Sequence, residues 1–86
     1  MYDVLLTHEA QRFYKQADPI LVRKLNRCFQ YLEKDPYEHP NIKRLKGPLA
    51  GNLRYQVGDW RMVYNVDEQK HEVVVLLTAH RSEVYR

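Results

Sequence analysis

Cysteine, glycine and long apolar runs are all scarce in this chain of 86 residues. Its single cysteine, Cys28, excludes an intramolecular disulfide and favours a reducing compartment. No apolar stretch approaches the length of a membrane-spanning helix, and the first residues lack the charged start and apolar run of a signal peptide. We therefore expect a single domain over residues 1–86, in a cytoplasmic protein that does not enter a membrane.

The residue types that usually hold metals and cofactors are few or scattered. Only three glycines are present, and they form no glycine-rich nucleotide loop. The histidines fall in different predicted elements with no ligand spacing between them; they are His8, His39, His71 and His80. The carboxylates form no pair placed for two-metal phosphoryl transfer or glycoside hydrolysis. We expect neither a metal nor a small-molecule cofactor.

Acidic residues are scarce in one region of the chain. The formal net charge is +3, and basic and acidic residues cancel at six each over residues 1–41. Between Lys43 and Arg61, five basic residues face only one acid, Asp59. Such a local excess suits the phosphate backbone of a nucleic acid, whereas the plainer interpretation is a solvated basic surface.

Periodicity and turn residues predict a strand and two helices in the first part of the chain. The strand is expected over residues 2–6, the first helix over 8–17 with Thr7 as its cap, and the second over 19–34. Cys28 lies on the apolar stripe of the second helix and is expected in the core. The opposite stripe is expected to be solvated and contains Arg23, Arg27, Gln30 and Lys34.

The second half of the chain predicts a loop and three strands. Residues 36–42 are expected to be a loop, and residues 43–52 a basic connection whose Gly47, Pro48 and Gly51 prevent regular structure. Residues 73–77 are continuously apolar, which predicts an interior strand covered on both faces.

The most informative stretch is RYQVGDWRMVY, residues 54–64, which predicts a β-hairpin. Gly58 and Asp59 are typical of a two-residue turn. The resulting register pairs Val57 with Trp60, Tyr55 with Met62 and Leu53 with Tyr64, and it leaves Arg54, Gln56 and Arg61 on the other face. The aromatic residues on the first face are expected to be core or partner contacts. Two arginines on one surface repel unless an anion is present, which indicates a phosphate-bearing partner; otherwise they only solvate an exposed face.

The last strand leaves one question open, namely which residue lies beside Arg61. A turn of three or five residues before this strand would place Arg81 there, whereas a turn of four residues would place His80 there. Tyr85 follows closely, either as a functional phenol or as a terminal residue that covers the sheet end.

The chain from KRLKGPLAGNLRYQVGDWRMVYNV to HRSEVYR resembles the RelE branch of the RelE/ParE toxin superfamily, and the preceding β-α-α order matches as well. The resemblance implies an α+β fold of order β-α-α-β-β-β, in which a helical hairpin packs on a mostly antiparallel four-stranded sheet, as in microbial ribonucleases. It also implies a type II toxin that enters the ribosomal A site and cuts mRNA without a metal until a RelB-like antitoxin binds it.

The resemblance also assigns residues. Arg61 matches the family's arginine in an R-x-V/I-Y strand, Tyr85 matches its C-terminal tyrosine, and Arg54 stands where the RelE branch has a lysine. Arg81 is the match to a second phosphate-binding arginine, and His80 resembles a histidine of some relatives. Arg61 and Arg81 would then stabilise the phosphate, Tyr85 or His80 would move a proton, and Arg54 would position the RNA. Contacts to mRNA or ribosomal RNA are expected from Lys43, Arg44, Lys46 and Arg86.

Two other functions remain open at this point. One is a ParE-like toxin of the same fold that inhibits DNA gyrase. The other is a non-catalytic module whose basic face only binds a nucleic acid or a protein.

Overall fold

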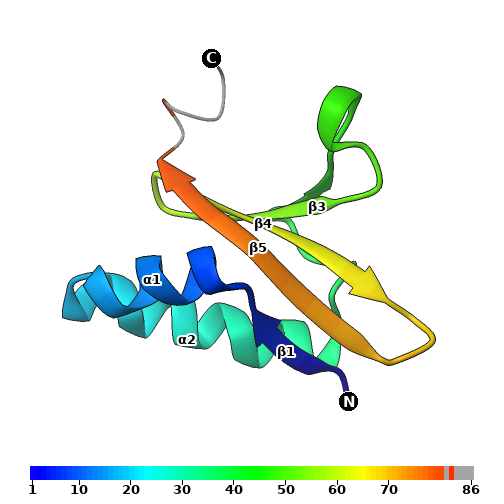
Figure 1. The fold of residues 1–86 in the computed structure, drawn as a ribbon, viewed down its shortest axis with the longest axis horizontal. Coiled ribbons are helices and arrows are strands. Elements are labelled where there is room, and N and C mark those ends of the chain that lie inside the picture. The colour runs from blue at the N-terminus through cyan, green and yellow to red at the C-terminus, as the bar shows by residue number, and fades with distance from the viewer. Residues whose placement is uncertain (81, 83–86) are drawn as a thin grey trace.

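The computed structural model describes residues 1–80 and 82. Its elements are, in chain order, β1 (Asp3–Leu6), α1 (His8–Gln16), α2 (Pro19–Lys34), β2 (Ile42–Arg44), the 3-10 turn η1 (Gly47–Leu49), β3 (Leu53–Val57), β4 (Trp60–Asp67) and β5 (Glu72–His80). The two helices form a hairpin that lies on one side of a single sheet (Figure 1).

Side-chain caps fix where both helices begin, as the sequence predicts. The Thr7 hydroxyl accepts the Ala10 N–H at the start of α1, at 3.2 Å. The Asp18 carboxylate accepts the Leu21 N–H at the start of α2, at 2.9 Å, and Pro19 occupies the first helical position. Each cap satisfies a backbone donor that the helix itself leaves without a partner.

The sheet has the strand order β1-β5-β4-β3-β2. β1 pairs with β5 in parallel and the other neighbours pair antiparallel, so the predicted α+β class and mostly antiparallel sheet are confirmed. The sheet has five strands rather than the expected four. The additional strand is β2, which pairs with β3 inside a stretch expected to be irregular, and η1 follows it.

The hydrophobic core lies between the helical hairpin and one face of the sheet. Tyr64 is fully buried there, and its hydroxyl donates to the Pro36 carbonyl at 2.6 Å. Cys28 lies in the same core, as predicted, and burial raises the pKa of its thiol. A raised thiol pKa and a buried position make Cys28 a packing residue and not a nucleophile.

β5 occupies an interior position in the sheet, as predicted, but the helices cover only one of its faces. Val73 and Val75 face the core and are buried, whereas Val74 and Leu77 are only half-buried on the other face. The expectation that this strand is covered on both faces is therefore wrong for the described residues. Neither α1 nor α2 is long and apolar enough to cross a membrane.

Candidate functional site

The face of the sheet turned away from the helices carries the arginines of the β3–β4 hairpin. The hairpin has the predicted register, in which Gln56 lies opposite Arg61 and Arg54 lies opposite Val63. Gly58 adopts a φ of 61°, the left-handed conformation that this turn requires and that glycine accepts without strain. Alternation along the strands then turns Arg54, Gln56 and Arg61 to the face without helices, which we call the outer face.

β2 adds a third cation to the outer face. Lys43 lies directly opposite Arg54, and Arg61 lies diagonally across from Arg54, so the three cations form a row over β2, β3 and β4. Diagonal neighbours in a sheet have Cβ atoms roughly 7–8 Å apart, within reach of long side chains. None of the residues paired with this row in the sheet is acidic. Lys43, Arg54 and Arg61 are called the outer basic row below.

The two arginines of the row are held differently. The Arg54 Nη1 donates to the Asn41 carbonyl at 2.8 Å, which fixes this guanidinium near the start of β2. Arg61 is half-buried, and its Nε atom is buried against the sheet. Partial burial lowers the local dielectric constant, so the field of the Arg61 guanidinium acts more strongly on an anion than it would in water.

Two other basic residues assigned to RNA binding do not join this row. Arg44 pairs with Leu53, a core residue, so its side chain lies on the helix side of the sheet. There its guanidinium carbon is 5.8 Å from the centre of the Tyr37 ring, a cation–π contact. Lys46 follows β2 and is exposed. The register of β2 therefore turns Lys43 to the outer face and Arg44 to the helix side of the sheet.

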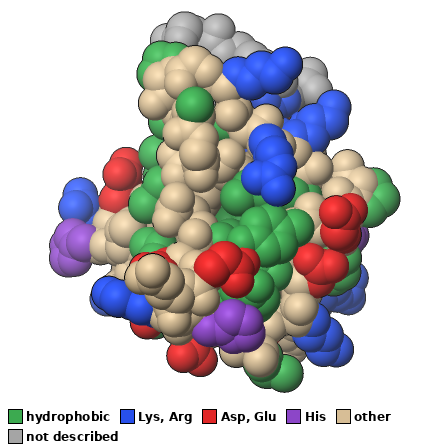
Figure 2. All heavy atoms as spheres, turned by 90° about the vertical axis from the view of Figure 1, so that its right-hand side faces the viewer, with side chains coloured by type: hydrophobic (Ala, Val, Ile, Leu, Met, Phe, Trp, Pro, Cys, Tyr) green, Lys and Arg blue, Asp and Glu red, His purple; other side chains and the backbone are tan. Residues whose placement is uncertain are grey.

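The side of the molecule that bears η1 and the β4–β5 turn shows an uneven charge distribution (Figure 2). A group of Lys and Arg side chains lies in its upper part, whereas Asp, Glu and His side chains lie lower together with further Lys and Arg side chains. The group in the upper part would attract an anionic ligand.

The register of β5 resolves the question of His80. The turn before β5 contains four residues, 68–71, which alone would bring His80 beside Arg61. A β-bulge at Leu76 adds one residue to β5, however, so Ala79 pairs with Arg61 and His80 pairs with Trp60. The rule based on turn length is therefore wrong, because it assumes an unbroken ladder.

His80 lies on the helix side of the sheet, where its ring meets the Trp60 ring edge-on at a centroid distance of 5.3 Å. Its Nδ1 accepts the Ser82 N–H at 3.3 Å. His80 is thus separated from the outer basic row. The other three site residues of the C-terminal end, Arg81, Tyr85 and Arg86, lie outside the described residues.

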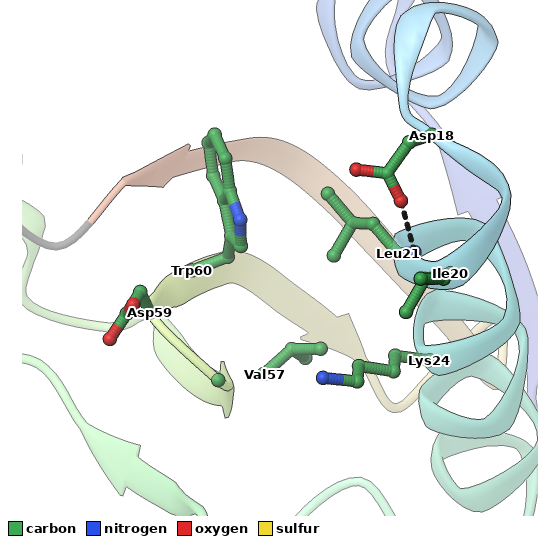
Figure 3. A pocket seen from close by; sticks show the side chains of 8 residues that line it. Asp18, Ile20, Leu21, Lys24, Val57, Asp59 and Trp60 are labelled. Atoms are coloured by element: carbon green, nitrogen blue, oxygen red, sulfur yellow. Dashed lines mark hydrogen bonds between the residues drawn. The ribbon is translucent and has the colours of Figure 1, made fainter.

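One cavity lies on the helix side, between the start of α2 and the β3–β4 turn (Figure 3). Its volume is about 330 Å³, and Ile20, Leu21, Lys24, Val57 and Trp60 contribute to its lining. Because Val57 and Trp60 face the helices, this cavity and the outer basic row lie on opposite faces of the sheet.

Over residues 1–80 and 82, no group of three His, Cys, Asp or Glu side chains is arranged to hold a metal ion. The outer basic row offers guanidinium and ammonium groups, which bind phosphate oxygens through charge-assisted hydrogen bonds.

A helical hairpin on one face of a mixed sheet, with cations on the other face, defines the class of fold to which the chain belongs. Known proteins share this fold. Residues 4–85 match the family model described as the ParE toxin of a type II toxin–antitoxin system, parDE. Toxin RelG of Mycobacterium tuberculosis is 31% identical over 86 residues, which cover 99% of this chain and 97% of RelG.

Solved structures agree with these matches. The toxin–antitoxin complex RelBE2 of Mycobacterium tuberculosis contains a chain that superposes with a TM-score of 0.81 at 27% identity, over 93% of this chain and 98% of that one. The isolated RelE toxin of E. coli has a TM-score of 0.78 over 99% of this chain and 92% of that one, and at 22% identity it shows a common fold. The chain belongs to the RelE/ParE superfamily of type II toxin–antitoxin toxins.

Site reasoning from the sequence missed Asn41, whose carbonyl holds Arg54. Asn41 directly precedes Ile42 in the loop that enters β2, so recognising β2 as a strand would have pointed to it.

Proposed function

We propose that this toxin is an endoribonuclease that cuts mRNA in the ribosomal A site and thereby stops translation. The observation that carries the proposal is the outer basic row, because three cations on one open sheet face match the spaced negative charges of an RNA backbone. Guanidinium and ammonium groups bind phosphate oxygens through charge-assisted hydrogen bonds, which supports a role of the row in binding an anion.

The proposed reaction uses the RNA's own 2′-hydroxyl as nucleophile, which requires no metal. Its oxygen forms a bond to the adjacent phosphorus while the bond from phosphorus to the 5′-oxygen breaks, giving a 2′,3′-cyclic phosphate and a 5′-hydroxyl. A base takes the proton of the 2′-hydroxyl, and an acid gives one to the leaving oxygen. Charge builds up on the phosphate oxygens during this exchange.

Roles follow from where each side chain lies. Arg61, with its Nε buried in the sheet, is proposed to stabilise the charged phosphate together with Arg81. Arg54 is held by the Asn41 carbonyl and is suited to positioning the backbone. Because His80 lies on the other side of the sheet from Arg61, the proposal assigns proton transfer to Tyr85.

A RelB-like antitoxin is the proposed natural partner, since RelBE2 was solved as a toxin–antitoxin complex. An antitoxin that neutralises the toxin is expected to carry acidic residues against the outer basic row. The proposed place of action is the cytoplasm, where ribosomes and mRNA are found.

The test is primer extension on a defined mRNA after incubation of the purified chain with programmed ribosomes. We expect cuts within the A-site codon. Arg61→Ala should lower the cleavage rate roughly 10²–10³-fold, as for loss of one charge-stabilising donor, and Arg61→Lys should restore only part of it, because an ammonium cannot grip two phosphate oxygens in a planar fork. Tyr85→Phe should also lower kcat strongly, and full cleavage by this variant would remove Tyr85 from proton transfer.

A gyrase inhibitor is the second candidate, because the matching family model is described as a ParE toxin. Supercoiling by purified DNA gyrase separates the two functions. Inhibition of supercoiling without mRNA cuts would establish the second function and overturn the first. Arg23→Gln serves as the charge control in both assays, since Arg23 is exposed on α2.

A further inference from the structure

A second polar cavity lies at the corner of the molecule where β2 begins. It has a volume of about 240 Å³ and opens between α2 and the end of β3. Its lining consists of Lys24, Arg27, Cys28, Asn41, Tyr55, Gln56, Val57 and Gly58. We call it the corner cavity.

The corner cavity adjoins the outer basic row through Asn41. The Asn41 carbonyl accepts both the Arg54 guanidinium, at 2.8 Å, and the Gln56 N–H, at 2.9 Å. The Asn41 side chain in turn donates to the Gln56 carbonyl at 3.1 Å. These bonds connect Arg54 to Asn41, a residue of the cavity lining, so the cavity adjoins the outer basic row at the edge of the sheet.

Two cations from α2 stand over this cavity. Lys24 and Arg27 are exposed and three residues apart, so they lie on the same side of the helix. The Lys24 side chain extends from α2 toward Val57 at the end of β3 (Figure 3). Like charges at this spacing repel weakly, and an anion between them would remove that repulsion.

The remaining lining favours a nucleotide over an acidic peptide. Asn41 and Gln56 offer amide groups, and the Tyr55 ring offers an aromatic surface. The Tyr55 ring is held in place by stacking on His39, at a centroid distance of 5.0 Å. Amides and a fixed aromatic ring beside two cations are the groups that bind single-stranded RNA.

We propose that the corner cavity binds a backbone phosphate of the RNA strand next to the phosphate that is cut, with Lys24 and Arg27 as its ligands. The proposal rests on the proposed function, because it extends the same RNA path beyond Arg54. It assigns a binding role to Arg27, which the sequence pattern alone places on a solvated stripe of α2.

The test compares two double variants that remove the same charge. Lys24→Gln with Arg27→Gln changes the corner cavity, whereas Arg12→Gln with Arg23→Gln removes two exposed cations from the helices outside it. Each is titrated by fluorescence anisotropy with a short single-stranded RNA whose cleavage-site 2′-hydroxyl is methylated. At 0.1 M salt we expect roughly ten- to thirty-fold weaker binding for the cavity variant and a salt slope smaller by about 0.7, from the one phosphate that is no longer neutralised.

Equal losses in both double variants, or none in either, would overturn the proposal. So would unchanged RNA binding with weakened binding of an acidic antitoxin peptide, which would assign the cavity to a protein partner. The RNA used here is not cleaved. A wild-type chain that makes no cuts on ribosomes therefore contradicts the proposed function, while a selective loss of RNA binding in the cavity variant still supports the corner cavity. When mRNA cleavage on programmed ribosomes is measured, the variant with Lys24→Gln and Arg27→Gln should show a higher KM and a nearly unchanged kcat.

Discussion

Hydrogen bonds of single side chains connect segments that are distant in the sequence, and Glu68 is the clearest case. Its carboxylate accepts hydrogen bonds from the hydroxyls of Tyr2, at 2.9 Å, and of Tyr37. The three residues come from the N-terminal segment, the β4–β5 turn and the loop after α2. The His71 ring stacks on Tyr2 at a centroid distance of 3.8 Å. One carboxylate thus joins three segments that are distant in the sequence.

This arrangement changes the acidity of its members. Burial, followed by the hydrogen bond to Glu68, raises the pKa of Tyr37 to about 12. The hydrogen bonds from Tyr37 and Tyr2 lower the pKa of Glu68. Because the folded-state pKa of Glu68 is depressed, its contribution to stability is present above the pKa of the unfolded chain, near 4.5, and is lost as the pH falls through the lower folded value.

Glu68→Gln should therefore lower the pKa of Tyr37 from about 12 while leaving it above the ordinary value, since burial remains. The measurement is a pH titration of the ¹³Cζ resonance of Tyr37, assigned with Tyr37→Phe. Glu9→Gln is the control, because Glu9 lies in the first turn of α1. If Tyr37 titrated in Glu68→Gln as it does in the wild type and in Glu9→Gln, the Glu68 carboxylate would have no influence on the pKa of Tyr37. The acid-induced loss of stability below about pH 4.5 should also become smaller in Glu68→Gln.

Individual residues also show what the sequence could predict. Cys28 and Tyr64 were assignable to the core because each lies on an apolar stripe or face with a regular period. Lys43 and Arg44 were not distinguishable, because neighbouring residues separate onto two faces only when both lie in a strand. The catalytic assignments to Arg81 and Tyr85 stay predictions.

Structural features that neighbouring residues determine could be predicted from the sequence, whereas features that involve distant residues could not. The β3–β4 hairpin follows from two turn residues and the alternation on either side of them, all within a few positions. The bulge in β5 depends instead on Thr7, whose hydroxyl donates to the Leu76 carbonyl at 2.7 Å while its N–H donates to the Val75 carbonyl at 3.0 Å. No pattern within β5 itself reports a contact to a residue so distant in the sequence.

Thr7→Ala tests this link between α1 and the bulge. The variant loses both the cap on the Ala10 N–H and the hydrogen bond to Leu76, so we expect the free energy of unfolding to fall by about 1–2 kcal/mol. Thr7→Ser keeps the hydroxyl and should retain most of that stability. Urea denaturation with an unchanged m-value provides the measurement. Equal stability of the alanine and serine variants would show that the hydroxyl does not stabilise the fold.

β2 could not be predicted from the sequence, again because it depends on pairing between two separate segments. It has only three residues, and its pairing with β3 is formed across the 3-10 turn at Gly47–Leu49. Glycine and proline in that turn predict irregular structure, whereas in the fold they only end the strand and return the chain to β3. The missed strand carries Lys43, so the outer basic row could not be completed from the sequence.

The two faces of the sheet differ in what they carry: one packs against the helices, and the other bears the cations. The hydrophobic core lies on the helix side, where residues of α1, α2 and four strands meet, and Val63 is buried on the outer face as well. The outer face contributes little to the core and carries the cations. Residues that serve binding on such a face need not favour the free folded state.

Lys43→Gln should therefore raise the stability of the free protein and weaken its binding of RNA. Lys43 and Arg54 are directly opposite each other, and removing one charge of such a pair relieves roughly 0.2–1 kcal/mol of repulsion. The gain, measured by urea denaturation, should shrink as salt rises, because exposed charges are screened. Arg12→Gln removes an exposed charge from α1 and should show neither effect. If Lys43→Gln instead lowered stability, the row would be held by attractive contacts within the protein.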